Sequence, residues 1–259
     1  MDQVIYPSDL TEQQWLLIEP LIPPERPGGR HREVNIRLVI EAPLYMSRTG
    51  CQWRYLPEKY PPRSTVYGYF KQWQDDDTWD NILKTLREQV RLKAGRNAQP
   101  TAGIIDSQTT KTTEQGGQRG YDGYKKVVGR KRHIIVDVLG LLICVMVHSA
   151  SIQDRAAARQ VIENALEICP TIKLFWADGG RTGKLIKWFK STFQGIFKIV
   201  KRPQKAFQVL LWRWIVERTF GWFNCYRRLS KDYERTVESS EAWVKLATIN
   251  ITVHRLEPG

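Results

Sequence analysis

The amino-acid sequence predicts an α/β protein in which a mixed sheet flanked by helices follows a small all-helical N-terminal part. Two observations predict this class. Over the first hundred residues, apolar side chains recur at helical spacing between breaks rich in Pro and Gly. From residue 101 onward, short apolar runs alternate with amphipathic segments, as expected for a sheet covered by helices. The linker at residues 93–101 therefore separates a predicted helical domain, residues 1–96, from a predicted α/β domain, residues 97–259.

Four helices are predicted in the N-terminal part, over residues 10–22, 34–48, 65–74 and 77–93. Thr11, at the start of the first of these, and Ser64, before the third, are the expected N-cap residues. Pro43 lies inside the second, where we expect a kink because proline removes a backbone donor. The third helix is short, aromatic and basic and follows a turn, which is typical of a helix-turn-helix DNA reader. Packing of its aromatic side chains in a core is the alternative.

Five strands and four helices are predicted in the second part. The strands cover residues 101–106, 131–138, 141–149, 171–178 and 195–202, and the helices cover residues 153–169, 183–193, 211–231 and 240–256. Leu139 and Gly140 form the turn of an early hairpin. Because strands and helices alternate after this hairpin, the sheet is predicted to be mixed.

Positive charge is concentrated in the second part of the chain. The net charge is +13, of which residues 1–100 contribute +1 (14 basic and 13 acidic residues) and residues 101–259 contribute +12 (26 and 14). This distribution predicts long-range attraction of a polyanion by the second part. A nucleic acid fits, and a ribosomal or membrane-surface role is the alternative.

The cysteines and the apolar runs predict the cellular compartment in which the protein occurs. The four cysteines show no CxxC spacing, as expected of buried thiols in a reducing environment. The N-terminal sequence has no secretory signal, and the longest apolar stretch, residues 139–147, is too short to cross a bilayer. We therefore expect a cytoplasmic protein with no membrane partner.

Three carboxylates form the candidate site. Asp106 and Asp178 each end a predicted strand, and ligands of α/β sheets bind outside such strand ends. Glu217 lies on the helix predicted over residues 211–231, which buries many aromatic side chains. Three converging carboxylates need cations to remain ionised. Two Mg²⁺ ions about 4 Å apart would supply that charge and could drive in-line displacement at a phosphodiester.

Other interpretations of these and other acidic residues remain open. Glu217 could simply form a surface ion pair with Arg213 four residues earlier. Asp137 is expected to cap the hairpin turn, and Asp154 to cap the helix that follows it. Asp122 lies in a Gly-rich basic loop that suits phosphate contact better than metal binding.

The candidate DNA contacts are basic residues on the second part of the chain. They would neutralise backbone phosphates, which makes binding strongly dependent on salt; solvated surface charge is the alternative for each. The candidates are Lys125, Lys126, Arg130, Lys131, Arg132, Lys201, Arg202, Arg213, Arg227 and Arg228.

Several long motifs occur in an order that resembles one protein family. They include IIDSQTTKTTE (104–114), RGYDGYKKVVGRKRHIIVDVLGLL (119–142), WADGG (176–180) and RWIVERTFGWFNCYRRLSKDYER (213–235). Together with LTEQQWLLIEPLIP and PPRSTVYGYFKQW in the first part, they look like the DDE transposases of bacterial insertion sequences, specifically the insertion sequence five family. The resemblance covers nearly the whole chain.

The resemblance implies a fold, a site and a reaction. The fold is a ribonuclease-H-like catalytic domain after a helical DNA-binding domain, and the metal-binding catalytic triad is Asp106, Asp178 and Glu217. The implied reaction is Mg²⁺-dependent cleavage at element ends, with Mn²⁺ as a substitute ion, and transfer of the freed 3′-OH into target DNA. The implied partners are terminal inverted repeats, target DNA and further copies of the chain, in the bacterial cytoplasm at the nucleoid.

Four positions depart from the family pattern. Arg213 matches the family's Arg four residues before the Glu, but Leu210 replaces its Tyr and Asn224 its later basic residue. Arg181 stands where the family has Tyr, and Pro43 interrupts a helix that usually continues. The alternatives are therefore a catalytically impaired DNA-binding relative or regulator of transposition, and a ribonuclease-H-like nuclease without strand transfer.

Overall fold

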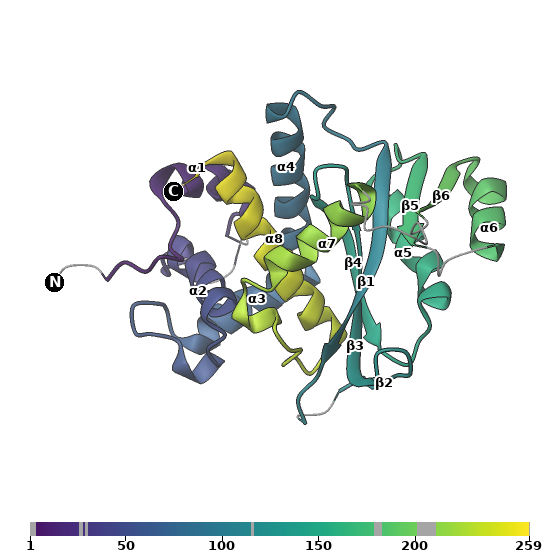
Figure 1. Cartoon of the computed structure of the whole chain (residues 1–259). Coiled ribbons are helices and arrows are strands. Elements are labelled where there is room, and N and C mark those ends of the chain that lie inside the picture. The colour runs from purple at the N-terminus through teal and green to yellow at the C-terminus, as the bar shows by residue number, and fades with distance from the viewer. Residues whose placement is uncertain are drawn as a thin grey trace.

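The structure is a computed structural model that describes residues 4–25, 28, 31–114, 117–178, 183–200 and 211–258. It shows an N-terminal group of helices beside a sheet covered by helices (Figure 1). The α-helices are α1 (Glu12–Ile18), α2 (Ile36–Thr49), α3 (Arg63–Asp75), α4 (Thr78–Lys93), α5 (Asp154–Ile168), α6 (Lys184–Phe193), α7 (Leu211–Phe223) and α8 (Val237–Leu256). The strands are β1 (Ala102–Lys111), β2 (Gly120–Asp122), β3 (Val127–Val136), β4 (Leu142–Ser149), β5 (Leu174–Asp178) and β6 (Ile196–Val200), and three short 3₁₀ turns are η1 (Glu19–Leu21), η2 (Trp53–Tyr55) and η3 (Arg227–Leu229).

The structure confirms one of the two predicted caps of the N-terminal helices. Thr11 caps α1 as predicted, because its hydroxyl accepts from the amide of Gln14 and the Gln14 side chain accepts from the amide of Thr11. The predicted Ser64 cap is wrong. Helix α3 begins at Arg63 after Pro62, which takes the cap position without a side-chain hydrogen bond. Helix α2 is assigned as one helix through Pro43, whose side chain is buried.

The sheet is mixed, as predicted. Its order is β4-β3-β1-β5-β6, with β2 pairing on the end of β3. The first three of these strands are antiparallel, and β1, β5 and β6 are parallel. Two parallel strands added to an antiparallel unit, with helices between them, form a ribonuclease-H-like arrangement.

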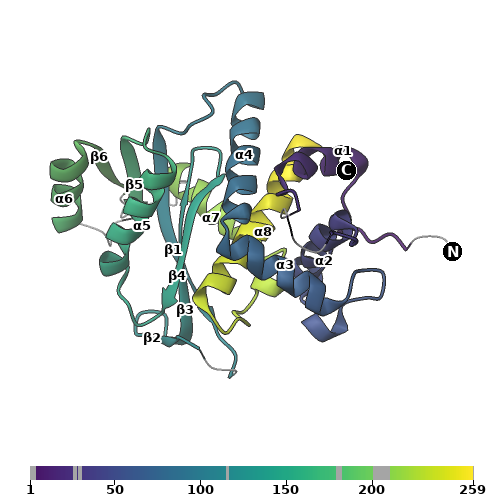
Figure 2. The ribbon, with the colours of Figure 1, turned by 180° about the vertical axis from the view of Figure 1, so that it is seen from behind.

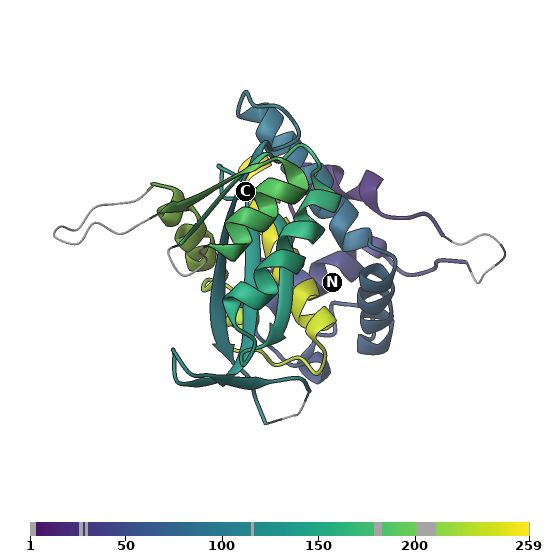
Figure 3. The ribbon, with the colours of Figure 1, turned by 90° about the vertical axis from the view of Figure 1, so that its right-hand side faces the viewer.

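Helices cover both faces of the sheet. Ile105 and Ile135 pack with α5 and α6 on one face, which Figure 3 shows from that side. Ile104 and Ile134 point the other way, into a larger core shared with α4, α7 and α8. Figure 2 shows α4 and α8 between the sheet and the N-terminal helices. The alternation along β1 follows from the period of two in a strand.

Helix α8 is the centre of the larger core. It is buried nearly all round and contacts α1, α2, α3, α4, α7 and β4. Trp243 on this helix stacks on Phe70 of α3 with ring centroids 5.0 Å apart. The helical region and the sheet are therefore packed around one helix. The division of the chain at residues 96 and 97 remains a prediction.

Candidate functional site

The pairing of two parallel strands brings Asp106 and Asp178 together. Ile105 of β1 is paired with Ala177 of β5, so the next residue on each strand is an aspartate at the same level. Neighbouring strands lie about 4.8 Å apart. The two carboxylates therefore start from adjacent backbone positions.

Both aspartates face helix α7. Ile104 and Trp176, which precede them by two residues, belong to the core on the α7 side of the sheet, and a strand repeats its direction every two residues. Both aspartates line a small hollow with Arg213 of α7. The Trp212 ring stacks on Trp176 at 4.1 Å and fixes the start of α7 against β5.

The predicted strand end at Asp106 is wrong in one respect. Strand β1 continues to Lys111, because residues 104–111 are paired with β3 along their whole length. Strand β5 does end at Asp178. Asp106 and Asp178 therefore lie close together because the end of β5 is beside the middle of β1.

Glu217 lies on the same side of the sheet but is held by an arginine. Its carboxylate accepts from Nε of Arg213 at 2.6 Å, and its side chain is about half exposed (48%). The hydrogen bond that Arg213 donates to Glu217 raises the pKa of Arg213, and the charges of Glu217, Asp106 and Asp178 add to the effect. Arg213 is therefore within electrostatic reach of all three predicted ligands.

The donor atoms of this site, though not their spacing, suit magnesium. Asp106, Asp178 and Glu217 offer only carboxylate oxygens, which are the ligands that Mg²⁺ prefers. In the described part of the chain, no three His, Cys, Asp or Glu side chains are grouped closely enough to hold a metal ion. The Arg213–Glu217 ion pair, which was the alternative interpretation of this helix, is formed in the structure.

Two other acidic residues have structural roles, and a third lacks the role that was predicted for it. Asp137 caps the hairpin turn as predicted, accepting from the amides of Leu139 and Leu141 at 2.9 Å. Asp122 accepts from the amides of the turn that follows it and from the Thr109 hydroxyl. The predicted cap role of Asp154 is wrong, because Gln153 is the cap residue of α5.

Arg130, Lys131 and Arg132 are buried in β3 and are not available to phosphates in this structure. Their guanidinium and ammonium groups bind protein acceptors instead: Arg130 pairs with Asp232 at 3.0 Å, and Arg132 donates to the carbonyl of Leu229 at 2.8 Å. Lys131 donates to a backbone carbonyl and lies 3.1 Å from an Asp154 oxygen. The sequence predicted a strand from residue 131, which contains Lys131 and Arg132, but β3 begins four residues earlier and so includes Arg130 as well.

The remaining predicted DNA contacts differ in exposure. Lys125 and Lys126 are exposed at the turn between β2 and β3, and Arg227 is exposed after α7. Arg228 is buried, because α7 ends at Phe223 and the chain turns inward. Lys201 and Arg202 lie outside the described residues, as do Arg181 and Leu210 among the departures from the family pattern.

The structure adds three exposed arginines that the sequence did not single out. Arg54, Arg63 and Arg235 come from distant parts of the chain and line one pocket. The signal available was the mixture of arginine with tyrosine around residues 53–67 and 233–235, but no spacing in the sequence brings the two segments together.

Two family models match different parts of the chain. A model described as a putative transposase of the IS4/5 family matches residues 10–83, and a transposase DDE domain matches residues 97–251, more than half of the chain. No helix in the described residues is both long and apolar enough to span a membrane.

Two curated relatives are similar to parts of the chain. An uncharacterized 16.2 kDa protein of insertion element IS402 from Burkholderia cepacia is 26% identical over 117 residues, 43% of this chain and 78% of its own length. The uncharacterized protein y4sN of Sinorhizobium fredii is 31% identical over 84 residues, 32% of this chain and 67% of its own length.

Proposed function

The chain belongs to the transposase DDE domain family, and from this premise we propose that it cuts DNA at the ends of an insertion element and transfers the freed 3′-OH into target DNA. The observation that supports this most is the placement of Asp106 and Asp178 at one level on β1 and β5, facing Arg213 and the helix of Glu217. Membership of a transposase family and a pair of carboxylates facing Arg213 both support a reaction at a phosphodiester.

Asp106, Asp178 and Glu217 are the proposed ligands of two Mg²⁺ ions, with Mn²⁺ as a substitute. Such ions activate the attacking oxygen and stabilise the leaving one when bound. Glu217 would hold the ions with its carboxylate oxygens, one of which accepts from Arg213 in the structure. Arg213 would supply positive charge there, since it lines the same hollow as both aspartates.

The proposed partners are the terminal inverted repeats of the element, the target DNA and a second copy of the chain. Two element ends have to be held together, which a homo-oligomer on DNA provides. Among the predicted phosphate contacts within the described residues, exposure favours Lys125, Lys126 and Arg227. We place the protein in the bacterial cytoplasm, at the nucleoid.

Substitution of the three carboxylates tests the proposed site. Purified protein is incubated with Mg²⁺ or Mn²⁺ and a labelled duplex carrying the inverted repeat found beside the gene. We expect Asp106→Asn, Asp178→Asn and Glu217→Gln each to lower the cleavage rate on the order of 100-fold or more, because each removes a ligand of ions that stabilise the transition state by several kcal/mol. Joined target strands are measured in the same reaction.

A matched variant, Glu167→Gln, changes an exposed carboxylate on α5 and is expected to leave cleavage unchanged. Unchanged cleavage in the three site variants would contradict the proposed triad. Cleaved ends without joined strands would identify a nuclease instead of a strand transferase.

A catalytically impaired DNA-binding relative is the second candidate. The ion pair that occupies Glu217 in the structure favours it, as does Asn224 in place of a basic residue. Wild-type protein that binds the repeat tightly but yields no product with either ion would support this candidate.

A further inference from the structure

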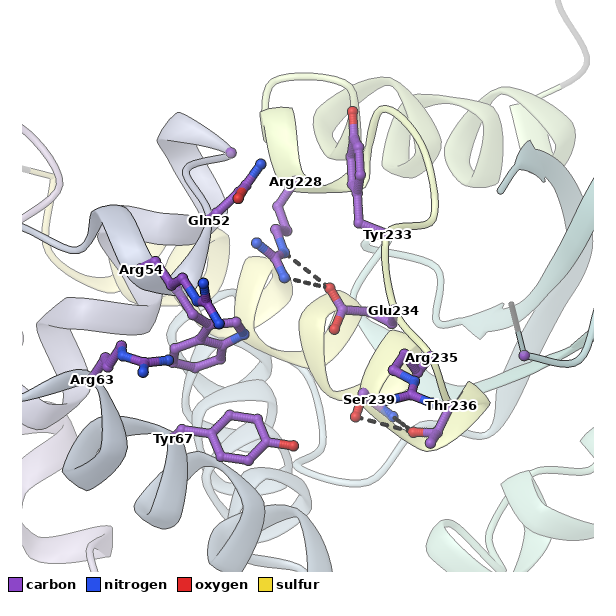
Figure 4. Close-up of a pocket in the computed structure, with 13 residues that line it drawn as sticks. Gln52, Arg54, Arg63, Tyr67, Arg228, Tyr233, Glu234, Arg235, Thr236 and Ser239 are labelled. Atoms are coloured by element: carbon purple, nitrogen blue, oxygen red, sulfur yellow. Dashed lines mark hydrogen bonds and ion pairs between the residues drawn. The ribbon is translucent and has the colours of Figure 1, made fainter. Parts of the chain in front are cut away.

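A pocket of about 820 Å³ lies between the N-terminal helices and the segment that joins α7 to α8 (Figure 4). We call it the composite groove, because each wall comes from a different one of the two family matches. Residues 50–67 form one wall, and residues 228–239 form the other, with Gly117 between them.

The composite groove carries uncompensated positive charge. Arg54, Arg63 and Arg235 are exposed in it, and no carboxylate of the described residues lies within ion-pair distance of their guanidinium groups. The carboxylate that lines the groove, Glu234, accepts two hydrogen bonds from Arg228 at 3.0 and 2.7 Å. This buried pair is close to neutral, so the groove as a whole attracts anions.

Aromatic rings are placed among these arginines. Tyr67 is 48% exposed and packs edge-on against Trp53 at 5.2 Å, while Tyr233 on the opposite wall is 38% exposed. Flat rings with hydroxyl tips beside guanidinium groups suit the sugars and phosphates of a nucleic acid better than a small anion.

Two helices also begin at the composite groove. Arg63 is the first residue of α3, whose N-terminus has no side-chain cap, and Thr236 is the cap residue of α8. Helix N-termini present backbone donors and a partial positive charge to phosphate groups. They add to the attraction that the three arginines provide.

Helix α7 connects the composite groove with the aspartates. It starts beside Asp178 and leads towards Arg228, crossing from the sheet to the N-terminal helices (Figure 1). Its thirteen residues span about 20 Å, which corresponds to roughly six base pairs of DNA at 3.4 Å each. A duplex that is cut at the aspartates and lies along α7 would carry its backbone phosphates towards the groove.

We propose that the composite groove binds the phosphate backbone of the DNA duplex several base pairs from the cut. The groove joins the helical region and the DDE region in one DNA-binding surface. The position of the groove relative to the cut rests on the proposed function. Binding of DNA by the groove can be measured without cleavage.

The test measures binding of a fluorescently labelled 40-base-pair duplex of arbitrary sequence by anisotropy, without divalent metal, over a range of salt concentrations. In a variant with Arg54→Ala, Arg63→Ala and Arg235→Ala, we expect weaker binding. The slope of log K against log salt should fall in magnitude by between two and three, since each neutralised phosphate contributes about 0.9. The charge-matched control is Lys184→Ala, Lys187→Ala and Lys190→Ala, which removes three exposed cations from α6.

A loss of slope in the groove variant that exceeds the loss in the α6 variant supports the inference. Equal losses in the two variants, or an unchanged groove variant, overturn it. Asp106→Asn separates the two proposals, because it is expected to bind with the wild-type slope and not to cleave. If the wild-type protein binds and cleaves DNA but the groove substitutions do not change binding, only the proposed DNA-binding role of the groove is rejected. If binding depends on the groove but no cleavage is seen, only the proposed enzymatic activity is rejected. Circular dichroism melting confirms that the variants are folded.

Discussion

Glu241 illustrates how a single half-buried acid couples the stability of this protein to pH. It lies on α8, and its carboxylate accepts from the amide of Val147 on β4 at 2.7 Å. Burial raises the pKa of Glu241 to about 7, against the lowering effects of the Val147 hydrogen bond and the charge of Lys245. The folded protein therefore holds this proton at a pH where the unfolded chain, with a carboxyl pKa near 4.5, has lost it.

The sign of the pH effect follows from proton binding. Between pH 4.5 and about 7 the folded state binds more protons than the unfolded state, so this group lowers the stability as pH rises through that window. We expect Glu241→Gln to raise the free energy of unfolding at pH 8 by on the order of 3 kcal/mol relative to wild type, and to have no such benefit at pH 4. Urea denaturation at several pH values measures this. Glu58→Gln, at an exposed site, is the control, and a pH-independent difference between wild type and Glu241→Gln would contradict the prediction.

At the same scale, the placement of two aspartates on strands could be predicted from sequence, and the burial of the arginines could not. Asp106 and Asp178 follow short apolar runs, and such runs predict strands whose neighbours share a register. The burial of Arg130 and Arg132 depends on acceptors about a hundred residues away, at Leu229 and beyond, which no local pattern contains.

At the scale of elements, β3 holds the connection between α7 and α8 in place. Arg130 pairs with Asp232, both fully buried, and also donates to the carbonyls of Arg235 and Thr236. One strand thereby fixes the segment that forms a wall of the composite groove. Most elements were predicted within a few residues, but β1 and β3 were not, because pairing between them extends both strands through polar sequence. The helix predicted over residues 211–231 is also wrong in its second half, since α7 ends at Phe223.

Breaking the Arg130–Asp232 pair is expected to destabilise the protein. Arg130→Met leaves the Asp232 carboxylate buried without its cation, which costs about 3–5 kcal/mol of unfolding free energy. The exposed pair of Lys71 and Asp75 is the matched control, and Lys71→Met should cost no more than about 0.5 kcal/mol. Urea denaturation compares the two, and similar small losses would show that the buried pair contributes little.

For the whole molecule, the larger core crosses the boundary between the two family matches. Trp15, Trp73 and Trp79 of the N-terminal helices belong to the same cluster as Ile134 of β3 and Trp243 of α8. The sequence predicted two regions correctly in kind, since composition and spacing change near residue 100. It did not indicate that they share a core, because that depends on where α8 packs.

A shared core predicts cooperative unfolding. We expect one transition on heating, with the far-ultraviolet signal of the helices and the tryptophan fluorescence changing at the same temperature, because neither region can keep its apolar surface buried without α8. Calorimetry checks that the van't Hoff and calorimetric enthalpies agree. Two resolved transitions would show that residues 1–96 and 97–259 unfold independently.

The position of α8 in the chain has a consequence for synthesis. Residues 237–256 are synthesised after every other helix and strand described here. The sheet and the N-terminal helices therefore cannot complete their common core until α8 has been made. During that interval the apolar sides of α2, α3 and α4 lack their partner. We therefore expect a chain that stops before residue 237 to expose apolar surface of these helices.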